Sequence, residues 1–338
     1  MSEKFKFDVV IGNPPYQEED GGAGSSSVPI YNKFMEEAVK LDPDYISFIT
    51  PSKWFAGGKG LDNFRNYMLS SGKLAYMEDY VNAKEVFDNT SIGGGVSFYL
   101  WSKKHKGTTK FVSYHDGNRV VADRDLTEFP IFVRYNEAVS IIHKVRNIDV
   151  KAVSEFVKPR NPFGFSSKER GNDFKSDENY IHLISSGGEG YIPYSDIKSG
   201  IDLVENYKVI ISKVTAEHAG EPDKKGMFKI VSTNRILKPN EVNTDSYLVI
   251  YSNENEQITQ NYLKYLQTKF YRVLLMQAVT SINLSKDKFD FVPVQNFEED
   301  SDIDWTKSIP EIDQQLYAKY GLDEHEIAFI EEKVKAME

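Results

Sequence analysis

The residues best suited to chemistry form the run Asn13-Pro14-Pro15-Tyr16, which directly follows the short apolar segment Phe5–Gly12. Two successive prolines hold φ at about −65° and remove two N–H donors. Each proline also favours an extended conformation in the residue before it. The backbone at this corner is therefore expected to be stiff, with carbonyl oxygens that meet few competing donors.

Such a corner suits a planar exocyclic amine. The side-chain oxygen of Asn13 and the carbonyl oxygen of Pro14 can each accept one N–H of an NH₂ group, and the ring of Tyr16 can stack on the attached ring. Because two acceptors favour a tetrahedral nitrogen, its lone pair becomes available to an electrophile. Positioning and electrostatics then do most of the work, and no strong base is needed. The alternative is a plain turn that ends a strand.

The sequence around the corner predicts alternating strands and helices in an α/β layer with a parallel core. The Val-Val-Ile run before Asn13 suits a strand that is buried on both faces. Ligands bind beyond the carboxyl ends of such strands, which is where the corner falls. The expected elements are strands at Phe5–Gly12, Tyr45–Thr50, Met77–Val81 and Val96–Trp101, and helices at Ile30–Leu41 and Leu61–Leu69.

The length of 338 residues predicts two domains. After Lys106 the alternation fades into many short β-rich runs, so a boundary is expected near residues 105–130, with one domain over 1–110 and another over 111–338. Within the second domain we expect helices at Glu137–Val145 and Gln257–Ala278, and two short helices around Gly321.

The composition excludes several classes of protein. Cysteine is absent, which excludes a disulfide scaffold and a thiolate metal site, and the six histidines show no metal-ligand spacing. Neither a signal peptide nor an apolar run of about 18 residues is present, so we expect a cytoplasmic protein with no membrane partner.

The charge is unevenly distributed. The formal net charge of −10 argues at first sight against a nucleic-acid partner, but binding depends on where the charges sit. Lys103–Lys175 contains 15 basic and 9 acidic residues, whereas Asn296–Glu338 contains 4 basic and 13 acidic ones. The middle segment could face phosphates, and the alternative is that both segments are ordinary solvated surfaces.

The corner and its flanks resemble a known family. The run Phe7–Gln17 resembles motif IV of the N6-adenine DNA methyltransferases. Similarity to the next strand and loop of Eco57I-type restriction–modification methylases is found at Ile46–Phe55, Gly57–Gly60 and Phe64-Arg65. Glu85–Gly95 resembles the family's motif VIII, in which an aromatic residue stacks on the second face of a flipped base. The resemblance thus implies that Phe87 is the partner of Tyr16, and a core phenylalanine at a hairpin is the alternative.

The resemblance continues at Tyr262–Phe270, Phe289–Phe297 and Leu316–Leu322, which are similar to the C-terminal part of the same enzymes, where target recognition lies. It implies a partial Rossmann-like methyltransferase sheet, followed by a mixed α+β target-recognition domain with an acidic helical tail. The implied activity is methyl transfer from S-adenosylmethionine to N6 of a flipped adenine in double-stranded DNA, within a restriction–modification system.

The family's Gly-rich cofactor loop lies upstream of the strand that ends in Asn13, and this chain starts twelve residues before Asn13. Gly93–Gly95 precedes a strand, and Ser185–Gly190 is followed by Pro193 rather than by a clean helix, so neither predicts that loop. We expect a complementing cofactor-binding chain or a missing N-terminal half; the alternatives are a decayed gene product and a fragment of a longer protein. The first strand becomes an open edge, which a partner, a second copy or a rearranged loop is expected to cover.

Extruding an adenine from a duplex costs about a few kcal/mol, which phosphate contacts offset. The candidate phosphate-binding residues are Lys103, Lys104, Lys106, Lys158, Arg160, Lys168 and Arg170. Asn161–Phe165 adds two aromatic rings among the later ones, although an ordinary loop with solvated charges is the alternative. Base edges would be read by Arg, Asn or Gln, and the sequence does not single out which.

Two other functions fit the same residues. One is a non-catalytic DNA-binding or specificity module that has kept its recognition region and lost its chemistry. The other is a protein glutamine N5-methyltransferase, because a glutamine amide can use the same corner; the long β-rich C-terminal region argues against it. An associated nuclease is not predicted, since Pro222–Lys225 reads as a turn.

Overall fold

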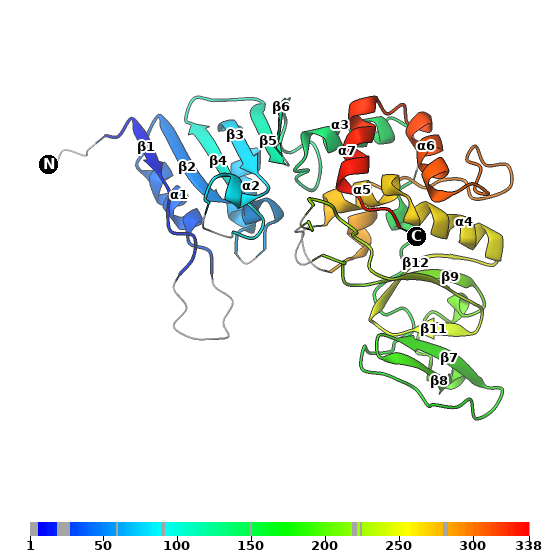
Figure 1. Ribbon diagram of the computed structural model, residues 1–338. Helices are drawn as coiled ribbons and strands as arrows, with labels where there is room; N and C mark the ends of the chain where they lie inside the picture. The colour runs from blue at the N-terminus through cyan, green and yellow to red at the C-terminus, as the bar shows by residue number, and fades with distance from the viewer. Residues whose placement is uncertain are drawn as a thin grey trace. The chain divides into compact units, whose positions relative to one another are not determined.

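The computed structural model describes residues 6–18, 28–58, 60–88, 92–115, 117–148, 151–217, 222–223, 225–279 and 283–337. The chain divides into two compact units, Met1–Asn136 and Glu137–Glu338 (Figure 1). Over the described ranges, none of the helices is both long enough and apolar enough to cross a membrane.

The first unit is built on a six-stranded sheet in the order β1-β2-β4-β3-β5-β6. Its strands are β1 (Val9–Gly12), β2 (Tyr45–Pro51), β3 (Leu74–Tyr80), β4 (Val96–Ser102), β5 (Thr109–His115) and β6 (Asn118–Arg124). Parallel pairing is confirmed for β1 with β2 and for β3 with β5. The expected parallel core is interrupted, because β4, which follows β3 along the chain, inserts antiparallel between β2 and β3.

Helices cover one face of this sheet. They are α1 (Tyr31–Lys40) and α2 (Asp62–Ser70), with the short 3₁₀ turn η1 (Ser52–Ala56). A second 3₁₀ turn, η2 (Ala83–Glu85), belongs to the opposite face. Tyr31, Met35 and Ala38 recur at helical spacing and are the buried residues of α1. They join the core cluster that contains Ile46 and Phe48 of β2. Burial of a large apolar side chain such as Met35, Ile46 or Phe48 stabilises the fold by about 1.5–3 kcal/mol.

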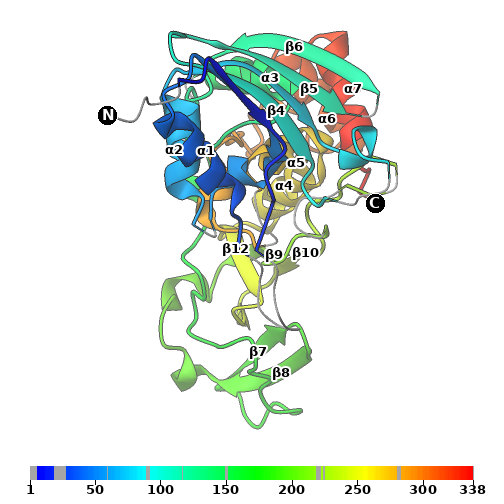
Figure 2. The ribbon, with the colours of Figure 1, turned by 90° about the vertical axis from the view of Figure 1, so that its left-hand side faces the viewer.

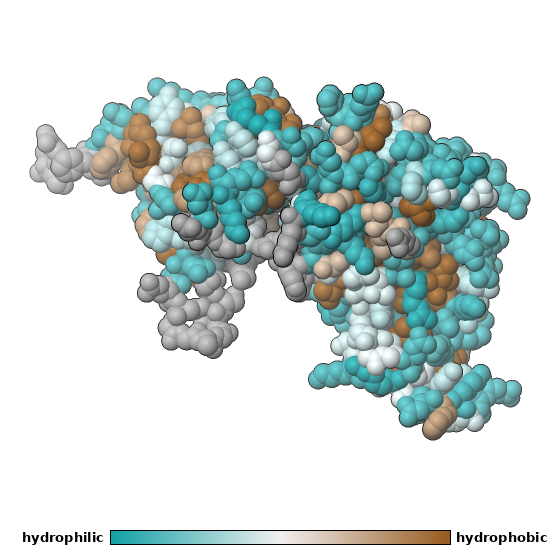
Figure 3. Space-filling view, in the orientation of Figure 1, coloured by the Kyte–Doolittle hydropathy of each residue, from teal (hydrophilic) through white to brown (hydrophobic). Residues whose placement is uncertain are grey.

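The opposite face is covered unevenly. A small cluster of Ile49, Ala83 and Val96 lies near one edge of the sheet, whereas Val9 and Ile11 of β1 remain 52% and 75% exposed. Among the described strands, β1 pairs with β2 alone, and Figure 2 shows it at the outer edge of the sheet. Apolar side chains gather over the β1 end of the surface in Figure 3. The first strand therefore has an open edge and a bare apolar face.

The first unit is longer than expected. The boundary expected after residue 110 lies inside β5, because β5 and β6 extend the sheet. The Asn136 side chain also donates hydrogen bonds to the Phe111 and Val120 carbonyls at 3.3 and 2.9 Å, and so attaches the chain as far as residue 136 to this sheet.

The second unit is mixed α+β, with two three-stranded sheets ordered β11-β7-β8 and β10-β9-β12. Its strands are β7 (Tyr180–Ser185), β8 (Gly188–Pro193), β9 (Tyr207–Ser212), β10 (Asn234–Leu237), β11 (Glu241–Asn243) and β12 (Tyr247–Asn253). Its helices are α3 (Asn136–Arg146), α4 (Glu256–Gln267), α5 (Lys269–Ala278), α6 (Ile309–Lys319) and α7 (Glu324–Lys333). Short 3₁₀ turns are η3 (Val153–Glu155), η4 (Tyr194–Asp196), η5 (Ile201–Leu203) and η6 (Lys286–Phe289).

Most of the expected helices of this unit are confirmed, including α3 and the pair around Gly321. The single helix expected over Gln257–Ala278 is wrong, because Thr268 takes an extended conformation and its hydroxyl accepts from the Tyr271 N–H at 3.1 Å. Thr268 therefore ends α4 and caps the start of α5.

Candidate active site

The corner after β1 lies at the carboxyl end of the parallel pair β1–β2, whose last paired residues are Gly12 and Phe48. Asn13 and Pro15 are exposed, and Pro14 is buried between them. The Ile30 N–H donates to the Tyr16 carbonyl at 3.3 Å, which ties the chain beyond the corner to the segment that leads into α1. An external group can therefore reach Asn13 while Pro14 anchors the loop.

Tyr16 lines the same corner but is half-buried, with its ring packed against the core cluster under α1. Burial raises the pKa of its hydroxyl, and the neighbouring Asn13 side chain opposes this only in part. The hydroxyl oxygen is buried, and the nearby Asn13 side chain acts on its pKa without making a hydrogen bond of standard geometry. Tyr16 therefore presents a neutral phenol whose polar atom is left unsatisfied in the protein alone.

Phe87 belongs to the other face of the sheet. It is half-buried and packs with the cluster of Ile49, Ala83 and Val96. Ile49 stands one position beyond Phe48, the last residue paired with β1. This cluster therefore extends to the carboxyl ends of β1 and β2, where the corner lies. Tyr16 and Phe87 thus lie in different clusters, one associated with each face of the sheet.

A buried polar network at this edge was not predicted from the sequence. Ser52, directly after β2, donates to the Asp79 carboxylate at 2.6 Å, and Arg134 donates to both oxygens of that carboxylate, at 2.7 Å for the Nη2 bond. Asp79 is fully buried in β3. The available signal was a carboxylate inside an apolar strand, which needs a positive partner.

Gly95 completes the network. Its φ of +79° favours glycine, and a Cβ there would overlap the Tyr80 carbonyl oxygen and lie 2.6 Å from Arg134 Nη2. The Ser52 N–H also donates to the Gly95 carbonyl at 3.0 Å. The second of the Gly-rich runs, around Gly188, forms the turn of the β7–β8 hairpin. Neither run has the strand-loop-helix setting of a cofactor loop.

The basic residues of the first unit lie at the amino-terminal end of β2, away from the corner. Lys103, Lys104 and Lys106 follow β4, and Ser102 pairs with Tyr45, the first residue of β2. Since Asn13 follows Gly12, which pairs with Phe48, about four residue steps of β2 separate this end from the corner, or about 13 Å. Lys103 is also paired with Asp42 at 2.6 Å. The structure does not bring these lysines to the corner.

The basic residues of the second unit are differently disposed. Arg160 makes two 2.8 Å hydrogen bonds to the Asp245 carboxylate, and Arg170 donates to the Ser167 and Glu169 carbonyls at 2.8 Å each. Lys168 is exposed and Lys158 is half-buried.

The expectation of aromatic rings interleaved with these charges is wrong. Phe163 and Phe165 are buried in the core of the second unit, where they pack with residues such as Ile181 and Leu203.

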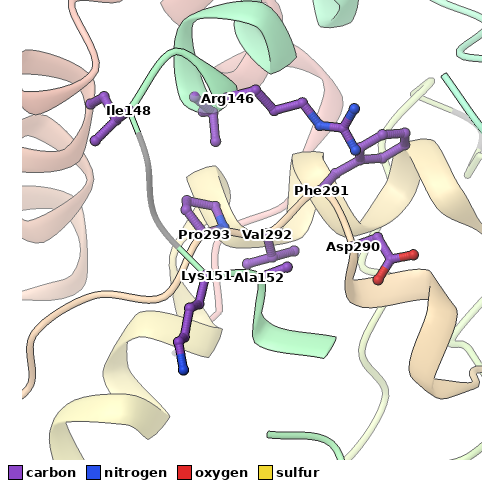
Figure 4. Close-up of a pocket in the computed structure, with 9 residues that line it drawn as sticks. Arg146, Ile148, Lys151, Ala152, Asp290, Phe291, Val292 and Pro293 are labelled. Atoms are coloured by element: carbon purple, nitrogen blue, oxygen red, sulfur yellow. The ribbon is translucent and has the colours of Figure 1, made fainter. Parts of the chain in front are cut away.

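A cavity of about 230 Å³ lies in the second unit, between the end of α3 and residues 290–293. Arg146 stacks over the Phe291 ring at 5.3 Å. Lys151 points in a different direction in Figure 4. The polar groups that line this cavity therefore do not converge on one point as those of ligand-binding pockets do. Over the described residues, no group of three or more His, Asp or Glu side chains is placed to hold a metal ion.

Comparison with known proteins identifies what the first unit is similar to. The model of the Eco57I restriction-modification methylases matches residues 1–87, which confirms the expected resemblance over that range. A protein of Mycoplasma pneumoniae described as an uncharacterized adenine-specific methylase is 31% identical over 108 residues, covering 31% of this chain and 26% of that protein. The chain therefore spans about a quarter of that relative's length.

Two solved restriction enzymes align with nearly the whole chain at low similarity. The type IIL restriction-modification enzyme MmeI, solved in complex with DNA, gives a TM-score of 0.41 at 10% identity over 95% of this chain and 56% of its own. The type IIG restriction endonuclease BpuSI gives 0.43 at 11% identity over 96% and 52%.

Proposed function

We propose that this chain carries the catalytic corner and the target-recognition region of a DNA adenine N6-methyltransferase of a restriction–modification system. The observation that carries the proposal is the exposed, proline-stiffened corner at the carboxyl end of β1, within the segment that matches the methylase family. Catalysis is assigned to Asn13, Pro14, Pro15 and Tyr16.

The corner acts by holding the amino group. Asn13 Oδ1 and the Pro14 carbonyl accept its two N–H groups, so that the nitrogen lone pair points away from the purine ring and toward the methyl donor. The proton leaves after transfer. The rate gain comes from fixed geometry and fixed dipoles, so no side chain need act as a strong base.

Tyr16 and Phe87 provide stacking surfaces for the flipped adenine. Because their clusters are associated with opposite faces of the sheet, a base inserted across the sheet edge has an aromatic ring available on each side. The Ser52–Asp79–Arg134 network holds together the ends of the strands between the two clusters.

The methyl donor is S-adenosylmethionine. The two Gly-rich runs of the described chain do not fit that cofactor: Gly95 is packed against Tyr80 and Arg134, and Gly188 lies in a hairpin turn. We assign cofactor binding to a complementing chain or to an N-terminal half.

The bare edge of β1 supports that assignment. Crossovers between neighbouring parallel strands are right-handed, and the step from β1 through α1 to β2 places α1 on the face of Val10. If further strands pair with the free side of β1 through right-handed crossovers, their helices pack on the opposite face of the sheet. Val9 and Ile11 are exposed on that face. β1 then becomes the switch point of a doubly wound sheet, and its carboxyl end is where ligands bind.

DNA contacts are assigned mainly to the second unit, through Lys158, Arg160, Lys168 and Arg170. Lys103, Lys104 and Lys106 lie at the opposite end of the strands from the corner, and they contribute to long-range attraction of the duplex rather than to a contact beside the flipped base.

The test is methyl transfer to duplex DNA by the full chain, alone and together with a candidate cofactor-binding polypeptide. We expect N6-methyladenine only in the combined sample, and no S-adenosylmethionine binding by this chain alone in calorimetry. Cofactor binding by the chain alone would contradict the assignment of that half. DNA binding without methylation in every combination would favour the non-catalytic module, and methylation of a protein glutamine would favour the other rival.

A further inference from the structure

Arg160 is held in place although its guanidinium lies at the surface. Its Nε and Nη2 donate to the two oxygens of Asp245 at 2.8 Å each. Asp245 also accepts from Lys213 Nζ at 2.8 Å, and its N–H donates to the Phe165 carbonyl at 2.9 Å. The Arg160 side chain is 68% exposed, whereas the Asp245 side chain is 16% exposed. These contacts hold the Asp245 carboxylate in place, and the carboxylate in turn fixes the orientation of the outward-facing Arg160 guanidinium.

This arrangement does little for stability. Exposed ion pairs contribute little to folding and restrict long side chains. Its effect is to remove rotational freedom from Arg160 before any ligand arrives. The Nε/Nη2 edge is occupied by Asp245, so the outer edge of the guanidinium keeps two N–H donors, one on Nη1 and one on Nη2, in a single fixed plane.

Two coplanar donors match one feature of duplex DNA closely. The N7 and O6 atoms of guanine present two acceptors side by side in the major groove, and a bidentate arginine is their commonest partner. We propose that Arg160, mounted on Asp245, reads a guanine of the target site. The proposal rests on the function proposed above and assigns Arg160 to sequence recognition rather than to a phosphate contact.

The neighbouring surface fits the same use. Ser246, next to Asp245, donates from its hydroxyl to the Ser186 hydroxyl at 3.1 Å. Ser186 precedes Gly187, and a Cβ at Gly187 would overlap the Arg170 guanidinium, so Arg170 lies against this turn. The Asp245 loop therefore contacts the Ser186 turn, which contacts Arg170 in turn. These loops carry hydroxyl and guanidinium groups, which are the groups that contact base edges and phosphates.

The experiment selects binding sites for the full chain from a library of random duplexes, using wild type, Arg160→Ala, Arg160→Lys and Asp245→Asn. Arg235→Ala is the control, since Arg235 is a half-buried arginine that is likewise paired with a carboxylate, that of Glu189, at 2.7 Å. We expect wild type to require a G·C pair at one position that becomes degenerate in R160A, with discrimination there falling about 5- to 150-fold. R160K keeps the charge but not the two-donor edge and should lose the same discrimination. D245N should weaken this preference for a G·C pair, and R235A should leave the preference unchanged.

Other outcomes overturn the proposal in distinguishable ways. If R160A weakens binding to all duplexes equally and R160K restores it, Arg160 is a phosphate contact and the function proposed above stands. If R160A leaves every base preference unchanged, Arg160 has no part in recognition. If wild type binds no duplex, both proposals fail. Circular dichroism melting of each variant separates loss of recognition from loss of folding.

Discussion

Arg134, whose side chain is partly exposed, donates to both carboxylate oxygens of the buried Asp79, and this pair joins β3 to the segment that follows β6. Ser52 adds a third hydrogen bond from the end of β2. Three parts of the chain that are distant in sequence therefore meet at one carboxylate. This carboxylate lies near the carboxyl end of β2, on the side of the sheet where the corner is found. The geometry of these strand ends depends on Asp79 keeping its partners Ser52 and Arg134.

Replacing Asp79 by Ala should destabilise the protein by about 3–5 kcal/mol, because Arg134 then loses its only charged partner among the described residues. Urea unfolding of the full chain measures this. The control is Glu37→Ala, which removes an exposed pair with Lys40 and should change stability by less than about 1 kcal/mol. Equal effects of the two variants would show that the Asp79 network contributes nothing special.

Gly95→Ala should cost more than about 2 kcal/mol, since it adds a clash with the Tyr80 carbonyl to the strain of a positive φ. Gly58 is the matched control: its φ is +76°, and a Cβ there meets nothing within 4 Å. Gly58→Ala should therefore cost only the conformational strain, about 1–2 kcal/mol. Thermal melting that ranks the two variants equally would contradict the close packing of Gly95.

Ile11→Lys should leave the stability of the isolated chain within about 0.5 kcal/mol of wild type, because Ile11 is 75% exposed. The same variant should abolish association with the cofactor-binding half, since it places a charge in the predicted interface. Val121→Lys, at a 42% exposed valine of β6 at the other edge of the sheet, is the control and should associate normally. Analytical ultracentrifugation of mixtures distinguishes these outcomes, and normal association of I11K would refute the assigned face.

The Arg160–Asp245 pair should make stability sensitive to acid. The Arg160 hydrogen bond, opposed by partial burial and helped by Lys213, lowers the pKa of Asp245 from 3.8 to about 2. Because the folded-state pKa lies below the unfolded one, its stabilisation is complete above pH 4 and is lost as pH falls toward 2. The loss should be on the order of 1 kcal/mol, given the exposure of Arg160. In D245N this part of the pH dependence should disappear from the unfolding free energy.

Local sequence patterns predicted the features that depend on neighbouring residues. The corner at Asn13, the helix at Tyr31–Lys40 and the strand at Tyr45–Pro51 were all expected, because proline geometry and helical spacing act over a few residues. The break at Thr268 was missed, because its threonine cap lies within an otherwise continuous apolar pattern.

Features that depend on distant pairing could not be read in the same way. The antiparallel insertion of β4 and the extension of the sheet by β5 and β6 are set by which strands meet, not by strand composition. Because β4 runs antiparallel to β2, its last residue lies at the amino-terminal end of β2, which places Lys103 away from the corner. Phe163 and Phe165 looked available between basic residues, but the hydrophobic core of the second unit buries them.

The most direct test of the account replaces Asn13, the exposed acceptor at the corner. The full chain and its cofactor-binding half are expressed in a host that lacks adenine methylation, and N6-methyladenine is quantified by mass spectrometry. Asn13→Ala should lower the methylation rate roughly 100- to 1,000-fold with unchanged affinity for DNA, whereas Asn63→Ala on the exposed part of α2 should have no effect. Methylation by N13A at the wild-type rate would contradict the claim that this corner holds the amino group.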